Sequence, residues 1–235
     1  MLKVSRQPSG EPEIFRSIQG EGISAGTPTV FLRLATCNLA CSWCDTKYTW
    51  DWDNFDREQE ILPLSTNDAE SRIVDFDVRH LVVTGGEPLL QQKDLAPLLE
   101  SLREKNYRIE VETNGTIAPS QEMLEHVSQW NVSPKIGNSA NTASRREVPK
   151  ALESFATQDN AYWKFVIVSR QDVNEASGLA SRYGVPAERV ILMPEGVTAD
   201  VLTERGAWLA EECARQGFRF STRLHIHLWG NERGR

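Results

Sequence analysis

Hydrophobic residues along the chain lie in short runs that polar, glycine or proline residues separate. Such runs, about four to eight residues long, are typical of strands buried in a sheet. They lie at 29–35, 80–86, 108–115, 130–133, 162–168, 189–194 and 223–229, and we predict a strand over each. In the last run His225 and His227 alternate with apolar residues, which predicts that both histidines share one face of a strand.

Helical patterns fill most of the intervals between these runs. Four leucines recur at the three- and four-residue spacing of one helix face: Leu95, Leu98, Leu99 and Leu102. Further helices are predicted from about Ser120, from Asp172 to Tyr183 and from Ala199 to Gln216. Gly184 and Gly217 follow the last two and are of the residue type that commonly ends a helix.

The alternation of strands and helices defines the expected fold. It indicates right-handed crossovers and a mostly parallel sheet. Because the strands are too few to close a TIM barrel, we expect an α/β fold with an open, partial TIM-like β/α barrel. One domain over 1–235 is expected, with its chemistry at the C-terminal ends of the strands. The loop 36–50 follows one such end, and the polar stretch 51–68 is interpreted as an excursion that covers the site.

Composition excludes several classes of protein. The chain has 235 residues, 40% of them hydrophobic, and a net charge of −7, with no basic run. An acidic chain of this kind is not expected to bind nucleic acid mainly by electrostatics. No apolar run approaches the roughly 18 residues of a membrane span. The first residues lack the apolar region of a secretory signal, so a cytoplasmic protein is expected.

Three of the four cysteines lie within eight positions, at Cys37, Cys41 and Cys44. Clustered cysteines outside a disulfide framework commonly hold metal or perform redox chemistry. No fourth ligand is near in sequence, and three thiolates suit a 4Fe–4S cluster that keeps one iron open. A zinc site completed by a distant histidine or by Cys213 is the alternative. Cys213 lies within a helical pattern, where a buried, small apolar role is expected.

The spacing C-x-x-x-C-x-x-C, with Trp43 before the last cysteine, resembles the signature of the radical S-adenosylmethionine (SAM) superfamily. "TGGEP" (84–88) and "ETNG" (112–115) end two predicted strands, as that superfamily's motifs do. The resemblance implies that the open iron binds SAM and that an electron from the cluster releases a 5′-deoxyadenosyl radical. We expect Gly85 and Gly86 to let the backbone approach the cofactor, and Glu87 to accept a hydrogen bond from the SAM ammonium.

The segment "IFRSIQGEGISAGTPTVFLRLATCNLACSWCDT" resembles the 7-carboxy-7-deazaguanine synthase family, as do "SPK" at 133–135 and the ending "LHIHLWGNERGR". The resemblance implies a lyase that converts 6-carboxy-5,6,7,8-tetrahydropterin to 7-carboxy-7-deazaguanine and releases ammonia. It also implies Mg²⁺, a homodimer, and an electron donor such as flavodoxin or ferredoxin. A radical SAM activase that forms a glycyl radical on a partner protein is the second enzymatic alternative, and a zinc-stabilised binding module is the non-enzymatic one.

The resemblance also implies roles for individual residues. Cys37, Cys41 and Cys44 would hold the cluster, and Thr46 would bind Mg²⁺. The implied SAM contacts are Gly86, Glu87, Ser133, Pro134, Lys135 and the turn Gln171, Asp172, Val173 and Asn174. The implied substrate contacts are Ile18, Gln19, Gly20, Arg33, Thr84 and the terminal Arg235.

Strand parity gives independent support for Arg33. Phe31, Arg33 and Cys37 have the same parity along the chain, so Arg33 is expected to point to the side of the cysteine loop. A guanidinium there can hold a carboxylate through two parallel hydrogen bonds. A purely structural ion pair is the alternative for this arginine.

Overall fold

One sheet of ten strands forms the centre of the computed structural model, which describes all 235 residues. The strands are β1 (Leu2–Ser5), β2 (Ile14–Ile18), β3 (Pro28–Leu34), β4 (Ile61–Leu64), β5 (His80–Gly85), β6 (Arg108–Thr113), β7 (Gln129–Val132), β8 (Ala161–Ile167), β9 (Val190–Pro194) and β10 (Arg219–Phe220). Their order is β10-β9-β8-β7-β6-β5-β3-β1-β4, with β2 paired to β3. From β3 to β10 all pairs are parallel, whereas β1, β2 and β4 pair antiparallel. This sheet is open, as predicted.

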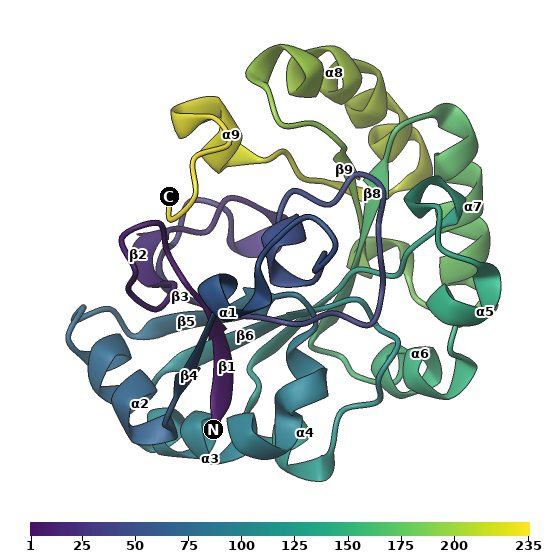
Figure 1. Cartoon of the computed structure of the whole chain (residues 1–235). Coiled ribbons are helices and arrows are strands. Elements are labelled where there is room, and N and C mark those ends of the chain that lie inside the picture. The colour runs from purple at the N-terminus through teal and green to yellow at the C-terminus, as the bar shows by residue number, and fades with distance from the viewer.

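Helices surround the curved sheet (Figure 1). They are α1 (Arg57–Glu60), α2 (Thr66–Val74), α3 (Gln92–Glu104), α4 (Gln121–His126), α5 (Ala143–Arg146), α6 (Pro149–Ala156), α7 (Arg170–Arg182), α8 (Ala199–Gln216) and α9 (Leu224–Trp229), with short 3₁₀ turns η1 (Gly22–Ser24), η2 (Lys47–Thr49), η3 (Pro88–Gln91), η4 (Gly137–Ser139) and η5 (Ala187–Arg189). The predicted caps are present: Ser120 accepts from the Met123 N–H, and Gly217 ends α8 at φ 73°. No helix combines the length and the apolar character needed to cross a membrane.

The two faces of β3 explain how the sheet separates core from site. Val30, Leu32 and Leu34 are fully buried in the main hydrophobic core between sheet and helices. Burial of each contributes roughly 1.5–3 kcal/mol to folding. Phe31 and Arg33, at the alternate positions, line a cavity on the opposite face. The orientation predicted for Arg33 from strand parity is therefore confirmed.

The last predicted strand, 223–229, is wrong, because Leu224–Trp229 forms α9 and Arg223 precedes it. Within α9 only Ile226 is buried, so the alternation of the sequence does not reflect a sheet face. Residues two apart lie on different sides of a helix. His225 accordingly lines the cavity, whereas His227 is exposed and bonds Thr222 through Nε2 at 2.9 Å.

The polar stretch 51–68 has a different position from the one expected. It contains α1, β4 and the start of α2, and β4 pairs with β1 at the edge of the sheet. None of its residues lines the cavity, so the prediction that this excursion covers the site is wrong. The C-terminal segment 231–235 lines the cavity in its place.

Candidate functional site

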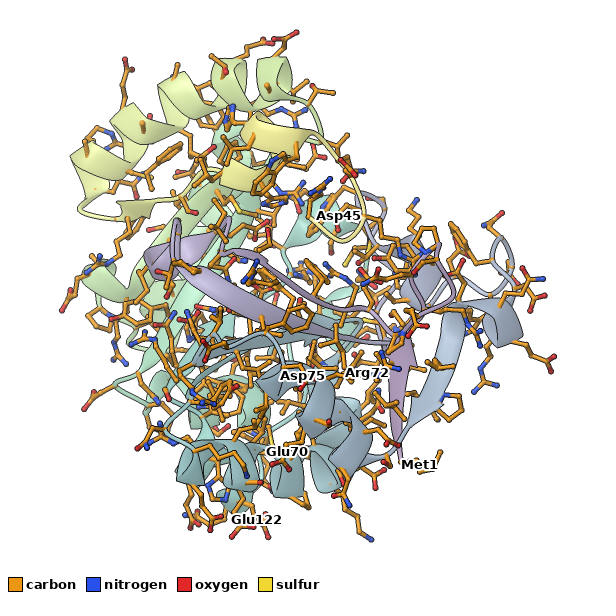
Figure 2. All side chains as sticks on the ribbon, turned by 90° about the vertical axis from the view of Figure 1, so that its left-hand side faces the viewer. Met1, Asp45, Glu70, Arg72, Asp75 and Glu122 are labelled. Carbon is orange, nitrogen blue, oxygen red and sulfur yellow. The ribbon has the colours of Figure 1, made fainter.

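A cavity of about 440 Å³ lies at the C-terminal ends of the parallel strands. This is the end of a β/α sheet at which active sites form, and the volume suits a small-molecule ligand. Side chains reach it from β3, β5, β6 and β8 and from the loops that follow β3 and β7: Arg33, Thr84, Glu112, Lys164, Cys37 and Ser133. Figure 2 shows Asp45, another lining residue, near the yellow C-terminal segment and away from Glu70 on α2 and Glu122 on α4.

The glycines after β5 hold the start of the cysteine loop. The Gly86 N–H donates to the Leu34 carbonyl at 2.9 Å, and the Glu87 N–H donates to the Thr36 carbonyl at 2.8 Å. A Cβ on Gly85 or on Gly86 would lie 1.9 Å from the same two carbonyl oxygens. Both glycines are therefore required by close contact with the backbone that carries Cys37. The expected approach of the backbone to a cofactor at these glycines stays a prediction, and both of them also line the cavity.

Glu87 is fully buried and lies outside the cavity. One carboxylate oxygen accepts from the Leu89 N–H at 3.0 Å and the Thr113 hydroxyl at 2.8 Å, and the other accepts from the Asn114 N–H at 2.7 Å. Burial raises its pKa, and these donors oppose that rise. Its carboxylate thus joins the ends of β5 and β6, and this arrangement gives no support to the predicted contact with the SAM ammonium.

Glu87→Gln is expected to destabilise the fold by about 1–3 kcal/mol, because the amide NH₂ must face one of three buried donors. It should also lower the iron content, since the Glu87 carboxylate fixes Asn114, whose amide donates to Asn38 and Cys37 in the cysteine loop. Urea unfolding and iron analysis of the reconstituted protein measure the two effects. Glu100→Gln, on the exposed side of α3, should change neither quantity, and equal behaviour of the two variants would contradict the role given to Glu87.

Cys37, Cys41 and Cys44 all line the cavity. Burial raises the pKa of the Cys37 thiol to about 12 and also raises that of Cys41. Nowhere do three His, Cys, Asp or Glu side chains converge on one point as the ligands of a single zinc ion do, so this geometry gives no support to the zinc alternative. Three thiols on one wall of a cavity fit a 4Fe–4S cluster with one iron open. Cys213 is buried in α8, as expected, and lies away from the cavity.

Arg33 takes part in an ion pair and also faces the cavity. Its Nε donates to Glu13 at 2.7 Å, and Glu13 also accepts from the Tyr48 hydroxyl at 3.0 Å and from Arg233 Nε at 3.1 Å. Glu13 is fully buried, and its bonds fix the plane of the Arg33 guanidinium. The side-chain hydrogen bonds of Arg33 use Nε only, which leaves both Nη groups to bind a carboxylate. The structural and functional interpretations of Arg33 are therefore compatible.

A partly buried carboxylate, Glu21, connects two buried cations at the cavity wall. Lys164 Nζ lies 2.5 Å and Arg223 Nε 3.0 Å from its oxygens, and Arg223 also pairs with Asp45. Burial raises the pKa of Glu21, but the charges of Lys164 and Arg223 outweigh it and hold that pKa well below the ordinary value of 4.5. The same pairing raises the pKa of Lys164. Ion pairs among Glu21, Lys164, Arg223 and Asp45 therefore hold these charged groups in fixed positions on the cavity wall.

Glu21→Gln should cost about 3–5 kcal/mol at pH 7, because it leaves two cations buried without their carboxylate. The depressed folded-state pKa means that the stabilisation by Glu21 is complete above pH 4.5 and is lost as the pH falls further. Urea unfolding should therefore show a constant difference between the two proteins from pH 8 to about pH 5, and a smaller one below. Glu11→Gln, in an exposed pair with Arg72, should behave like the wild type; a Glu21→Gln difference that grows in acid would contradict this account.

The structure brings together most, though not all, of the residues that the resemblance implies. Those that line the cavity are Ile18, Gln19, Gly20, Arg33, Cys37, Cys41, Cys44, Thr46, Thr84, Gly86, Ser133, Lys135 and Arg235. Those outside it are Glu87, Pro134, Gln171, Asp172, Val173 and Asn174. Asp172 accepts from the Val168 and Ser169 N–H groups at 2.8 Å each, and Val173 is buried in the core. These two residues thus build the start of α7, and the second SAM-binding turn was placed on residues that do not face the cavity.

Sequence reasoning missed several residues of the cavity wall: Glu21, Asp45, Tyr48, Glu112, Lys164, Arg223 and His225. One of them has a readable signal. Lys164 interrupts the apolar run of β8, and a lone charge in such a strand is retained only where a partner or a cavity receives it. Glu21, Asp45 and Glu112 lie within the motifs quoted above, although no role was assigned to them. Tyr48, Arg223 and His225 reach the cavity through contacts between segments far apart in sequence, which no local pattern records.

Comparison with known proteins agrees with this geometry. The model of the radical SAM superfamily matches residues 33–203. The 7-carboxy-7-deazaguanine synthase of Pyrobaculum aerophilum is 38% identical over 95% of this chain and 96% of its own length, and that of Hyperthermus butylicus is 34% identical over 91% and 90%. The crystal structure of QueE from Escherichia coli superposes with a TM-score of 0.70, at 25% identity over 95% of this chain and 94% of that one. The chain therefore belongs to the radical SAM superfamily and, within it, to the family of 7-carboxy-7-deazaguanine synthases.

Proposed function

We propose that this chain converts 6-carboxy-5,6,7,8-tetrahydropterin into 7-carboxy-7-deazaguanine with loss of ammonia, a step of queuosine or related deazapurine biosynthesis. The enzymes of its family use a 4Fe–4S cluster and SAM, which when bound supply a 5′-deoxyadenosyl radical that abstracts hydrogen from the substrate. The observation that carries the proposal is the position of Arg33. Arg33 lines the same cavity as the three cysteines, and neither of its Nη groups has a hydrogen-bond partner, so it can hold a carboxylated substrate beside the site of radical formation.

A second group of polar side chains suits the pterin ring. Glu112 accepts from the Gln19 amide at 3.3 Å and the Thr84 hydroxyl at 2.8 Å, and Lys164 Nζ lies 3.9 Å from it. These groups present fixed acceptors and donors to the N–H and carbonyl edge of a heterocycle. Ile18 and Gly20 flank them. The chain's own contribution is thus to bind the substrate at two ends and hold it still.

The SAM and Mg²⁺ sites are proposed next to the cysteine loop. Lys135 Nζ donates to the Ser133 hydroxyl at 2.8 Å and lies 5.3 Å from the centre of the Trp43 ring, so the loop after β7 reaches the cysteines. The Thr46 hydroxyl lines the cavity 3.6 Å from Cys44 Sγ. Mg²⁺ prefers oxygen ligands and retains several waters, so Thr46 together with substrate oxygens is an adequate site.

Family membership supports the remaining proposals, namely a cytoplasmic location, flavodoxin or ferredoxin as electron donor, and a homodimer. The homodimer has one further support on the surface. Phe220 on β10 and Leu228 and Trp229 on α9 are exposed, and large apolar side chains of this kind are common at contacts between subunits.

An anaerobic assay tests the proposed reaction. The reconstituted protein is incubated with SAM, dithionite and 6-carboxy-5,6,7,8-tetrahydropterin, and the products are separated by chromatography with mass detection. The expected result is 7-carboxy-7-deazaguanine, ammonia and 5′-deoxyadenosine. Cleavage of SAM with no consumption of the pterin would contradict the substrate assignment, and hydrogen abstraction from a partner protein would favour the glycyl-radical activase.

A further inference from the structure

Three side chains outside the family's ligand motif donate N–H hydrogen bonds to the cysteine sulfurs: Trp50, Asn141 and, at a longer distance, Asn114. The first is Trp50, whose indole Nε1 lies 3.3 Å from Cys44 Sγ. An indole N–H can only donate, and this is the sole bond it makes. The backbone that carries the ring is fixed by two hydrogen bonds. The Trp50 N–H donates to the Lys47 carbonyl at 3.0 Å, and the preceding Thr49 carbonyl accepts from the Thr36 N–H at 2.7 Å. The direction of this bond is therefore fixed by the fold of the cysteine loop.

The second donor is Asn141, in the connection between η4 and α5. Its Nδ2 lies 3.3 Å from Cys41 Sγ, and its Oδ1 accepts from the Ala40 N–H at 3.1 Å. Because the oxygen must face that backbone donor, the NH₂ group must face the sulfur. Asn141 is buried, so water does not compete for this bond. The remaining sulfur, that of Cys37, accepts a backbone N–H from Leu39 at 3.5 Å and, at the longer distance of 3.9 Å, the Asn114 amide N–H.

We propose that Trp50 and Asn141 raise the reduction potential of the cluster by donating N–H···S hydrogen bonds to two of its three thiolates. Reduction adds one electron, taken from an external one-electron donor, and increases the negative charge on the iron–sulfur core and its sulfurs. A fixed N–H dipole stabilises that added charge more than it stabilises the oxidised form, so it shifts the potential upward. No proton moves, because the N–H stays on the indole or amide. Both residues act through the cysteines, as positioning residues.

The test measures the midpoint potential of the reconstituted cluster in the full chain, by redox titration with the reduced form followed by electron paramagnetic resonance. Trp50→Phe removes the N–H and keeps an aromatic ring, and it should shift the midpoint to a more negative value at an unchanged iron content. Asn141→Ala should shift it in the same direction. Trp52→Phe is the matched control: its indole makes no hydrogen bond and lies outside the cavity, and its potential should equal that of the wild type. No substrate is present, so failure of the proposed reaction would not affect the result.

The proposal would be overturned if Trp50→Phe, at full iron content, had the same midpoint potential as the wild type. Equal shifts of the midpoint potential in Trp50→Phe and Trp52→Phe would also overturn it. If Trp50→Phe does not retain iron, Trp50 is replaced by benzothienylalanine, which keeps the fused ring and substitutes sulfur for the N–H. The same negative shift is then expected. Loss of the cluster in that variant too would assign Trp50 a structural role and also overturn the proposal.

Discussion

Cys41→Ala is expected to abolish both the brown chromophore of the iron–sulfur cluster and all cleavage of SAM. Three cysteines line the cavity, and the fourth, Cys213, lies away from it in α8, so no other thiolate of the chain replaces the one removed. Cys41 is buried, so a solvent thiol does not readily take its place. With only two thiolates the protein no longer coordinates three of the four irons, and the cluster is not retained. Iron and sulfide content, visible absorption and the yield of 5′-deoxyadenosine measure the loss.

Cys213→Ala is the matched control for that variant. Cys213 is also buried, but it lies in α8, where its thiol contacts the Arg219 carbonyl at 3.6 Å. Its replacement should cost about 1 kcal/mol of stability through lost packing and leave the cluster intact. A full 4Fe–4S spectrum in Cys41→Ala would show that the ligand assignment is wrong.

The parts of the fold that were predictable are those in which burial and local periodicity agree. The run 29–35 became β3 because its apolar residues face the core on one side, and the same reasoning placed Arg33 on the other. The helix 199–216 was predicted with its observed bounds, because Thr198 caps one end and Gly217 ends the other. In such segments the local signal and the tertiary structure require the same conformation.

The C-terminal segment shows why other parts were not predictable. Arg233 donates to Glu13 and to Glu60, both at 3.1 Å, and lies 3.5 Å from the centre of the Tyr48 ring. These contacts join the last residues to the first strands and to the cysteine loop, across most of the chain length. Nothing in the local pattern of 230–235 indicates these contacts. The resemblance alone implies a position for Arg235 at the site, whereas the polar composition of 51–68 favoured that stretch as its cover.

The motif after β5 shows a second limit of sequence reasoning. The residue types mark Gly85, Gly86 and Glu87 as important, but a residue type does not reveal which atoms the residue contacts. The glycines meet the carbonyls of Leu34 and Thr36, and Glu87 meets the donors at the end of β6. Close backbone approach is the physical requirement at both glycines, and the chain itself is one partner in it.

Arg33→Lys is expected to lower kcat/KM for the carboxylated pterin by about 10²-fold, chiefly through KM, because lysine keeps the charge opposite Glu13 but loses the paired Nη donors. Initial rates of product formation over a range of substrate concentrations measure it. A drop in kcat alone, at unchanged KM, would contradict a binding role for the guanidinium.

Removal of the substrate carboxylate provides the decisive comparison for Arg33. In the wild type, tetrahydropterin without its carboxylate should bind about 10²-fold more weakly than the substrate, whereas in Arg33→Lys the two ligands should bind with similar affinity. Arg72→Lys, in the exposed pair with Glu11, should leave both affinities unchanged. If the carboxylate retained its full effect on binding in Arg33→Lys, another group would hold it, and Arg33 would serve only as the partner of Glu13. Because the ion pair to Glu13 survives in the lysine variant, that outcome separates the structural role of Arg33 from its role in binding.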